Sequence, residues 1–510
     1  MLFRRASIIG LLMLFLTVLL HGQGFRSRFK IQYALNNTAR AVFEITPGNY
    51  IAAGFVSDTN TSRLAIIGLN SIGQPLWVKK YGNAKFQYLM NNFIRRSFYK
   101  QGAYIYHACC VKDSNNKQFG VLIKFALNGD TLWQKIYRDP LEDVVPQMVT
   151  GSVDGGFLIT GFFQNWANNT RPALLIKTDI NGNELWRKRL HKVTPDISDG
   201  KSILQDTASK KIVIAGFQNQ GGPVNDENIL ILDSIGNIKD FTAFVPHGAT
   251  IYDLIQTKDK NFVLTGMRYE NTTLGGYYLR RSYVIKFDLS FPQTPIWNVI
   301  IDKPTLENTA TNLRELSSGE ILVGGAIDTL QILNRPTNVL MRFSKISTLG
   351  NITFNRYYDF KINDSLKDNN MGLSSFELCQ DGGWVAAIQV VNTPNPNPFF
   401  FVKYDANGCD TLATHCATMN LVGIKSLEKD ISDIKIYPNP FNDILTIDVF
   451  EDRFSENIEL ILFDVLGKEV LREKLMKNFT ISTKQLDKGV YFLKVSNQDR
   501  IRYYQKIIKE

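Results

Sequence analysis

The chain has 510 residues, of which 44% are hydrophobic, 12% aromatic and 21% charged. This length and composition exclude a disordered chain, a coiled coil and a disulfide-dense miniprotein, and they predict roughly two to four domains with a sizeable core. The 58 basic and 48 acidic residues leave a net charge of +10 without any run of five like charges. The sequence therefore predicts no nucleic-acid partner.

Residues 1–24 have the pattern of a secretory signal peptide. Arg4 and Arg5 precede an apolar run over 8–20, and Gly22-Gln23-Gly24 offers a small-x-small cleavage site. A membrane anchor is the alternative, but a helix of this length rises only about 20 Å, which is short of the bilayer core of about 30 Å. No later stretch is long and apolar enough to span, so we expect an exported chain without a stable membrane span.

The chain has five cysteines, an odd number, so at least one thiol is unpaired within an exported monomer. Cys409 and Cys416 are close enough in sequence to form a bridge, but spacing alone leaves this open. Neither the cysteines nor the five histidines show a zinc-binding spacing. We expect no metal and no cofactor.

An internal repeat dominates residues 25–416. Strand-like runs such as 120–126 and 173–178 lead into a glycine turn, and a strand opened by tryptophan follows. Successive turns are 53 to 58 residues apart, at Gly73, Gly129, Gly182, Gly236, Pro292, Gly350 and Gly408. About four short strands per repeat is the arithmetic of a β-propeller blade. The pattern predicts an all-β fold with a seven-bladed β-propeller over 25–416; a solenoid or two β-sandwiches are the alternatives.

The last repeat lacks an outer strand, and the start of the mature chain resembles one. The run Phe29 to Tyr33 parallels the outer strand that begins at Trp133. We therefore predict that residues 28–35 complete the seventh blade and close the ring, which would remove an exposed sheet edge.

The repeat region shows little sign of catalytic chemistry. Its Asn-Gly-x-x-Leu-Trp turns resemble the tryptophan-docking motif of quinoprotein propellers, and Cys109-Cys110 resembles the vicinal pair near their cofactor, but those enzymes typically have eight blades. The acidic residues fall mostly in Asp-Gly turns, and no nucleophile elbow, zincin, P-loop or calcium-loop motif occurs. We predict that the protein is not an enzyme and has no catalytic residue.

Residues 417–433 have the pattern of a linker, and the rhythm changes after them. Seven short strand-like runs separated by turns fill residues 434–510. This density of strands predicts a small Ig-like β-sandwich.

The segments IKIYPNPFNDILTIDV, LFDVLGKEV, LDKGVYFLKV and YYQKIIKE resemble, in order, the blocks of the type A C-terminal sorting domain of the bacterial type IX secretion system. The resemblance implies export through the periplasm, recognition by the outer-membrane translocon and sorting machinery, and release or attachment at the cell surface. The residues that match the motif are Tyr437, Pro438, Asn439, Pro440, Gly467, Lys488, Gly489, Lys506 and Lys509.

The sequence therefore predicts a secreted or surface cargo whose propeller binds a glycan or a protein; the alternative is a secreted carbohydrate-active enzyme. Loops carry most binding sites on such scaffolds. We expect ligand contacts in the insertions 83–98, 268–280 and 392–398, with Phe86, Tyr88 and Tyr278 as candidates. The ligand, cleavage of the sorting domain and oligomeric state are left open.

Overall fold

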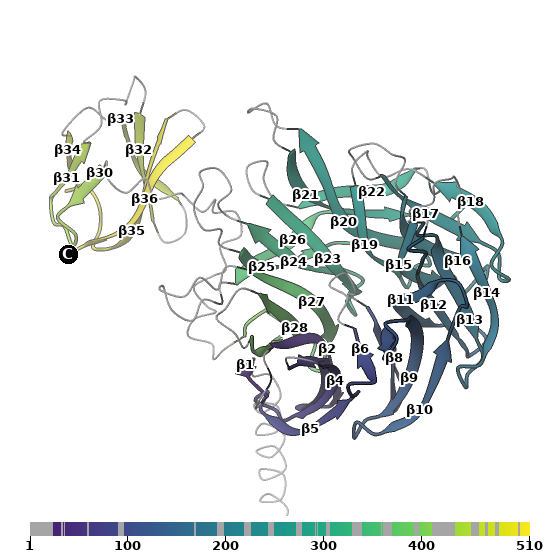
Figure 1. Ribbon diagram of the computed structural model, residues 1–510. Helices are drawn as coiled ribbons and strands as arrows, with labels where there is room; N and C mark the ends of the chain where they lie inside the picture. The colour runs from purple at the N-terminus through teal and green to yellow at the C-terminus, as the bar shows by residue number, and fades with distance from the viewer. Residues whose placement is uncertain are drawn as a thin grey trace, which may run out of the picture. The chain divides into compact units, whose positions relative to one another are not determined.

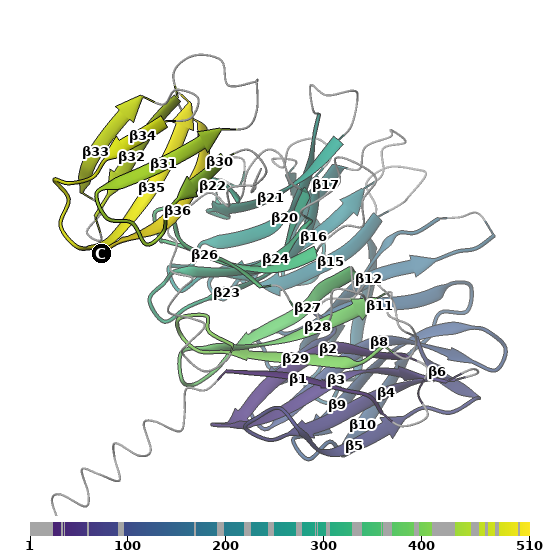
Figure 2. The ribbon, with the colours of Figure 1, turned by 90° about the vertical axis from the view of Figure 1, so that its left-hand side faces the viewer.

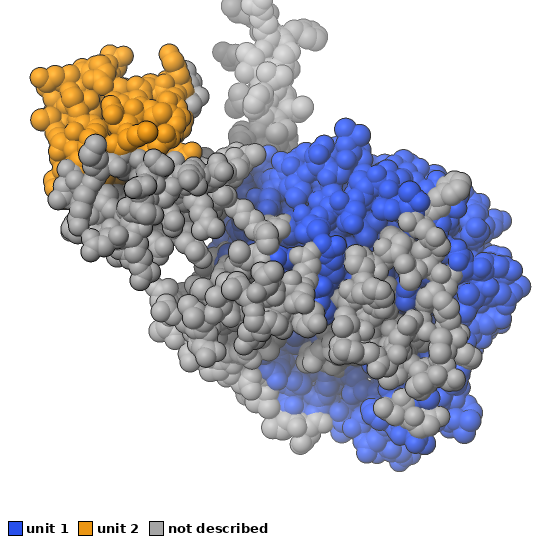
Figure 3. Space-filling view, turned by 90° about the horizontal axis from the view of Figure 1, so that it is seen from above, with its two compact units in different colours: residues 1–420 blue, residues 421–510 orange. Residues whose placement is uncertain are grey.

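The computed structural model shows an all-β protein, as predicted: its described residues form strands β1 to β36 and no helix. The chain divides into two compact units, Met1–Asn420 and Leu421–Glu510, which Figure 3 colours separately. The structure describes residues 24–410 and 434–510, except for 32–33, 35, 59–60, 90–95, 168–169, 191–197, 219–225, 243–248, 272–277, 291, 293, 302–306, 329–338, 359, 361–369, 392–396, 450–457, 465–467, 475–478 and 498–499.

Seven antiparallel sheets make up the first unit (Figure 1). In five of them four strands follow one another in sequence, and sheet 2 has a fifth strand. Sheet 1 contains β2 (Asn36–Thr46), β3 (Asn49–Ser57), β4 (Ser62–Leu69) and β5 (Pro75–Tyr81). Sheet 2 contains β6 (Phe86–Tyr88) and β7 (Phe98–Gln101), then β8 (Tyr104–Asp113), β9 (Gln118–Ala126) and β10 (Thr131–Tyr137). Sheet 3 contains β11 (Asp143–Gly151), β12 (Phe157–Gln164), β13 (Ala173–Thr178) and β14 (Glu184–Leu190).

The remaining sheets repeat this order. Sheet 4 contains β15 (Ser198–Gln205), β16 (Ile212–Gln218), β17 (Asp226–Leu232) and β18 (Ile238–Thr242). Sheet 5 contains β19 (Ala249–Gln256), β20 (Phe262–Asn271), β21 (Tyr278–Phe287) and β22 (Pro295–Ile301). Sheet 6 contains β23 (Glu307–Glu315), β24 (Ile321–Asp328), β25 (Val339–Ile346) and β26 (Ile352–Tyr358). Sheet 7 contains β27 (Asn370–Leu378), β28 (Trp384–Val391), β29 (Phe399–Tyr404) and, from the other end of the chain, β1 (Phe25–Phe29).

The sheets form a closed, propeller-like ring. Each sheet contacts the next one: β4 contacts β6, β8 contacts β11, and the first strands β11, β15, β19, β23 and β27 contact one another in turn, while β27 and β28 of sheet 7 contact β2 of sheet 1. Strand β1 pairs antiparallel with β29, from Phe25 opposite Lys403 to Phe29 opposite Phe399. Figure 2 shows this purple strand alongside the green strands of sheet 7. The N-terminal segment thus supplies the outermost strand of the last sheet.

The register of this closing strand corrects our prediction. We placed residues 28–35 in the strand with Phe29 in the tryptophan position, but the strand is Phe25–Phe29, and Phe25 covers the turn glycine Gly73 of sheet 1. Ser27 continues the contact, because its hydroxyl donates to the Gly73 carbonyl at 2.6 Å. Alternation of apolar and polar residues fits both registers, and the contact with the neighbouring turn selects between them.

The same contact joins the sheets around the ring. Each covered glycine has a positive φ of 76° to 85°, and a Cβ built on it would lie 2.4 to 2.9 Å from the aromatic ring of the preceding sheet's outer strand. Glycine is therefore needed both for the turn and for the ring above it. The pairs are Phe25 with Gly73, Trp77 with Gly129, Trp133 with Gly182, Trp186 with Gly236, Trp297 with Gly350 and Phe354 with Gly408.

The outer strand of sheet 4 lacks the aromatic residue, and the next sheet lacks the turn glycine. The position four residues after Gly236 holds Asp240, where Trp77 and Trp133 stand after their own turn glycines. The turn of the next sheet has Pro292 in place of a glycine. Aromatic ring and facing glycine are thus absent together, as expected if each residue requires the other.

The second unit is a sandwich of two sheets. One contains β30 (Ile434–Tyr437), β31 (Ile444–Val449) and β34 (Phe479–Ser482), and the other contains β33 (Glu469–Lys474), β32 (Ile458–Phe463), β35 (Gly489–Asn497) and β36 (Arg500–Lys509). Alternate residues such as Leu445 and Ile447 from the first sheet and Leu460, Leu462 and Leu493 from the second form one buried core. Its likeness to an immunoglobulin fold stays a prediction.

Candidate functional site

A bulge recurs on the innermost strands of the ring. In six sheets one residue is skipped in the pairing just before the four-residue segments 41–44, 148–151, 202–205, 253–256, 312–315 and 375–378. Sheet 2 has the equivalent segment, β7, but residues 89–97 separate it from β6. The one-residue bulge of the other sheets is therefore a nine-residue insertion here, and bulges of this kind re-aim side chains toward sites.

A cavity of about 350 Å³ lies among the innermost strands. Its lining comes from β2, β7, β11, β23 and β27, together with Arg96 from the insertion. The wall therefore draws on sheets 1, 2, 3, 6 and 7, so the cavity lies on the axis of the ring. The lining residues are Phe43, Glu44, Arg96, Phe98, Tyr99, Lys100, Met148, Val149, Thr150, Arg314, Glu377 and Leu378.

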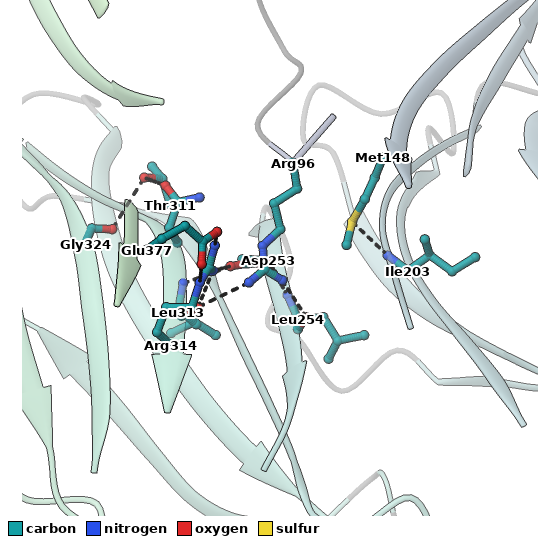
Figure 4. Close-up of polar contacts among 11 residues, drawn as sticks. Arg96, Met148, Ile203, Asp253, Leu254, Thr311, Leu313, Arg314, Gly324 and Glu377 are labelled. Atoms are coloured by element: carbon teal, nitrogen blue, oxygen red, sulfur yellow. Dashed lines mark hydrogen bonds and ion pairs between the residues drawn. The ribbon is translucent and has the colours of Figure 1, made fainter. Parts of the chain in front are cut away.

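Arg96 ties the insertion to the opposite wall (Figure 4). Its Nη1 lies 2.9 Å from Oδ1 of Asp253 in β19, and its guanidinium donates to the carbonyl oxygens of Leu254 and Leu313 at 3.4 Å. The Arg96 side chain is 18% exposed and that of Asp253 is 1% exposed. An ion pair from sheet 2 to sheet 5 thus crosses the ring.

Both carboxylate oxygens of Asp253 have hydrogen-bond or ion-pair partners. The amides of Leu254 and Leu313 donate to its two oxygens at 2.9 and 2.8 Å, and Arg314 Nη1 lies 3.8 Å from Oδ2. Burial raises the pKa of Asp253, while the charges of Arg96 and Arg314 oppose the rise. Burial, reinforced by the like charge of Arg314, lowers the pKa of Arg96. The hydrogen bonds from the Leu313 and Leu254 amides favour the charged form of Asp253 and likewise oppose the effect of burial on its pKa.

Two carboxylates, Glu44 and Glu377, line the cavity. Glu377 accepts two hydrogen bonds from Arg314, one of them at 2.8 Å from Nε, and Glu44 accepts the amide of Gln380 at 2.6 Å. Burial by itself lowers the pKa of Arg314, but the charge and hydrogen bonds of Glu377 leave it raised. Lys100 contributes an ammonium group to the same lining. Charged groups of both signs beside Phe43, Phe98 and Tyr99 suit a polar ligand with an apolar face.

Two of the predicted loop aromatics pack between sheets. Tyr88 is buried in the core between sheets 1 and 2, and Phe86 packs against the same core. Burial makes the prediction of Tyr88 as a ligand contact wrong, whereas Phe86 is only partly buried and its prediction stays untested. The side chain of Tyr278 and the segments 272–277 and 392–396 lie outside the described residues. Arg96, which the insertion brings to the cavity, was missed; an arginine inside a long inner-strand insertion was the available signal.

The described cysteines are buried or bonded within the fold. Cys109, Cys110 and Cys379 are free and buried, and burial raises the pKa of each thiol. Cys409 is disulfide-bonded; Cys416, the partner that the spacing left open, lies outside the described residues. Within the described ranges no group of three or more His, Cys, Asp or Glu side chains is placed to hold a metal ion.

Several residues of the predicted sorting motif lie at one corner of the sandwich. The Asn439 side chain accepts the amide of Ile508 at 2.9 Å, and Phe441 accepts the amide of Glu510 at 2.9 Å. Lys509 is buried, and its Nζ donates to the Thr483 carbonyl. The Pro-Asn-Pro turn, with two cis prolyl bonds, is thereby joined to the C-terminal strand.

The other predicted motif residues are more exposed or undescribed. Tyr437 is exposed and donates to Asp448 at 2.7 Å; Pro438, Pro440, Lys488 and Gly489 are exposed as well. Gly467 and the side chain of Lys506 lie outside the described residues. The role of each in sorting stays a prediction.

The last unit defines the class of the protein: an exported protein carrying a C-terminal sorting sandwich. Residues 435–510 match the family described as secretion system C-terminal sorting domain. The chain therefore carries the sorting domain of type IX secretion and is a cargo that is secreted or attached at the cell surface, as the sequence predicted. No helix in the described ranges has the length and apolarity to cross a membrane.

No curated protein matches the chain. Similar solved structures include an ulvan lyase of a polysaccharide lyase family bound to an oligosaccharide (9% identity, 82% of this chain and 93% of that chain, TM-score 0.40). A xylan β-1,4-xylosidase from Bacillus halodurans C-125 has 8% identity over 75% of this chain and 98% of its own, with a TM-score of 0.29. A mannose phosphorylase from Leishmania mexicana has 10% identity over 51% and 82%, with a TM-score of 0.30.

These neighbours correct one prediction. We predicted from missing motifs that the protein is not an enzyme, but the three similar structures named above are enzymes, so that exclusion is contradicted and we withdraw it. Absence of a known motif was a weak ground, because catalytic groups can come from several strands of a ring and leave no local signature. The low TM-scores assign no reaction to this chain.

Proposed function

We propose that this cargo binds a glycan or a protein outside the outer membrane through the axial cavity of its ring. The observation that supports this is the charged and aromatic lining at one place, contributed by Glu44, Lys100, Tyr99 and Phe43 from different sheets. A ligand there would be held by groups on paired strands, whose positions are fixed better than those of loop residues. We also propose the domain boundaries given by the sequence, with the ring at 25–416 and the linker at 417–433.

Purified mature protein would be screened on glycan arrays and by capture of extracellular proteins. We expect Lys100→Ala to weaken binding of any retained ligand by at least about tenfold, because a charged hydrogen bond contributes about 1.5–3 kcal/mol. Leu132→Ala is the matched control, since Leu132 is exposed on the outer strand β10. Equal binding by both variants would place the ligand elsewhere.

A secreted carbohydrate-active enzyme is the second candidate. It is favoured by the presence of two carboxylates, Glu44 and Glu377, in one cavity, since glycoside hydrolysis commonly uses a carboxylate pair. Release of reducing sugar would be measured alongside binding. Loss of release with retained binding in both Glu44→Gln and Glu377→Gln would support catalysis; no release from any bound glycan by the parent protein would reject it.

A further inference from the structure

Trp166 differs from the other tryptophans of the ring. Trp384 is fully buried, and Trp77, Trp133, Trp186 and Trp297 pack against the cores between sheets. Trp166 is 71% exposed. It lies in the connection between β12 and β13, at the edge of sheet 3 where β11 begins. A large ring left in water here does not serve the inter-sheet packing.

The exposed ring is nevertheless held in place. Its Nε1 donates to Oδ2 of Asp143 at 2.8 Å, and Asp143 is buried and accepts the Gln118 amide at 3.1 Å through Oδ1. The backbone amide of Asn165 donates to the Thr170 carbonyl at 3.0 Å, which closes the hairpin that carries the ring. An indole anchored at its polar edge presents its apolar face to solvent at low entropic cost on binding.

The surroundings of Trp166 are polar. Glu142, buried beside Asp143, is paired with Arg189 and accepts the Asn165 side-chain amide at 3.3 Å. Lys117 Nζ lies 4.0 Å from Asp143. Each charge has an opposite partner, so the rim offers hydrogen-bonding groups without a strong net charge. Protein hot spots are usually surrounded by contacts that exclude water, whereas a single aromatic face with a polar rim matches a sugar ring.

We propose that Trp166 is the stacking platform of a neutral carbohydrate site at this edge of sheet 3. A pyranose presents weakly positive C–H groups on one face, which suit the electron-rich face of the indole, and hydroxyls at its edge, which suit Asn165 and Arg189. This inference rests on the proposed binding function and names its ligand class, but it places a sugar contact away from the axial cavity.

Isothermal titration of the full mature chain with xylohexaose, cellohexaose and mannohexaose would test the platform. We expect at least one to bind, with Trp166→Ala weakening binding at least fivefold, or about 1 kcal/mol, the usual effect of removing one stacked ring. Leu141→Ala is the matched control, because Leu141 is 82% exposed and precedes the same carboxylates. It should stay within roughly twofold. Thermal melts of both variants would verify the fold.

The outcomes separate this inference from the proposed function. Binding that Lys100→Ala weakens and Trp166→Ala leaves unchanged would overturn the platform and support the axial cavity. Binding of none of the three sugars by the parent protein would also overturn it, while a captured protein ligand would keep the proposed function. Equal losses in Trp166→Ala and Leu141→Ala would reject stacking as the cause.

Discussion

Closure of the ring by β1 gives the sharpest stability prediction. Phe25 is 6% exposed, lies 5.4 Å from the ring of Tyr50 in an edge-on arrangement and covers Gly73. Replacing a buried phenylalanine by alanine costs about 3–5 kcal/mol, and a terminal strand can relax, so we expect about 3 kcal/mol for Phe25→Ala. Phe29 is only partly buried, so Phe29→Ala should cost about 1–2 kcal/mol.

Urea denaturation followed by tryptophan fluorescence would measure this loss. All six tryptophans lie within residues 1–420 and none in 421–510, so the signal reports the ring alone. Leu76→Ala is the control, because Leu76 is 63% exposed on β5, and it should stay within about 0.5 kcal/mol. A larger loss for Phe29→Ala than for Phe25→Ala, or a Phe25→Ala midpoint equal to that of Leu76→Ala, would refute the closure contact.

Three further predictions concern charged groups. Burial lowers the pKa of His107 to about 3, so below about pH 6.5 the unfolded chain binds a proton that the folded chain does not. The free energy of unfolding should therefore fall by about 1.4 kcal/mol per pH unit below about pH 6.5. Urea midpoints at about pH 5 to 7, above the range in which carboxylates titrate, should show this slope for the parent protein and not for His107→Gln. Burial by itself raises the pKa of Asp154, but hydrogen bonds from Lys177, Ser152 and Gly156 lower this pKa to about 2. The ionised Asp154 therefore stabilises the fold above its ordinary pKa of 3.8, and this stabilisation is lost as the pH falls toward 2. Asp154→Asn should reduce the dependence of stability on pH in this range, and an acid titration identical to that of the parent protein would contradict this. Arg96→Gln should lower the free energy of unfolding by about 1–3 kcal/mol, because Asp253 keeps Arg314 and two amides; an unshifted urea midpoint would show that the cross-ring pair contributes nothing.

The repeat could be predicted from the sequence because the residues that define it recur at regular positions. Each turn needs a glycine such as Gly129 or Gly182. The aromatic residue that covers it, Trp77 or Trp133, stands four residues after the turn glycine of the preceding repeat. Four strands per period then follow from the turn spacing. The sorting sandwich was readable for a different reason: four sequence blocks recur in fixed order, and residues 435–510 match that family.

The candidate site could not be predicted from the sequence in the same way. Arg96 meets Asp253 and Leu313 only because the ring closes, so contacts spanning more than 150 residues depend on geometry that no local pattern records. The prediction for Tyr88 was wrong because an aromatic residue in an insertion has the same sequence signal whether it faces a ligand or a neighbouring sheet. The register of β1 was misplaced by four residues for a similar reason, since Phe25 and Phe29 both fit the alternation.

The account depends most on the sorting sandwich. The direct measurement is localisation of the full chain and of a chain lacking residues 435–510, both expressed in a bacterium with a type IX system and detected by fractionation. The full chain should reach the medium or the cell surface, whereas the shortened chain should accumulate in the periplasm with its ring folded. Equal appearance of both chains outside the outer membrane would contradict the sorting role.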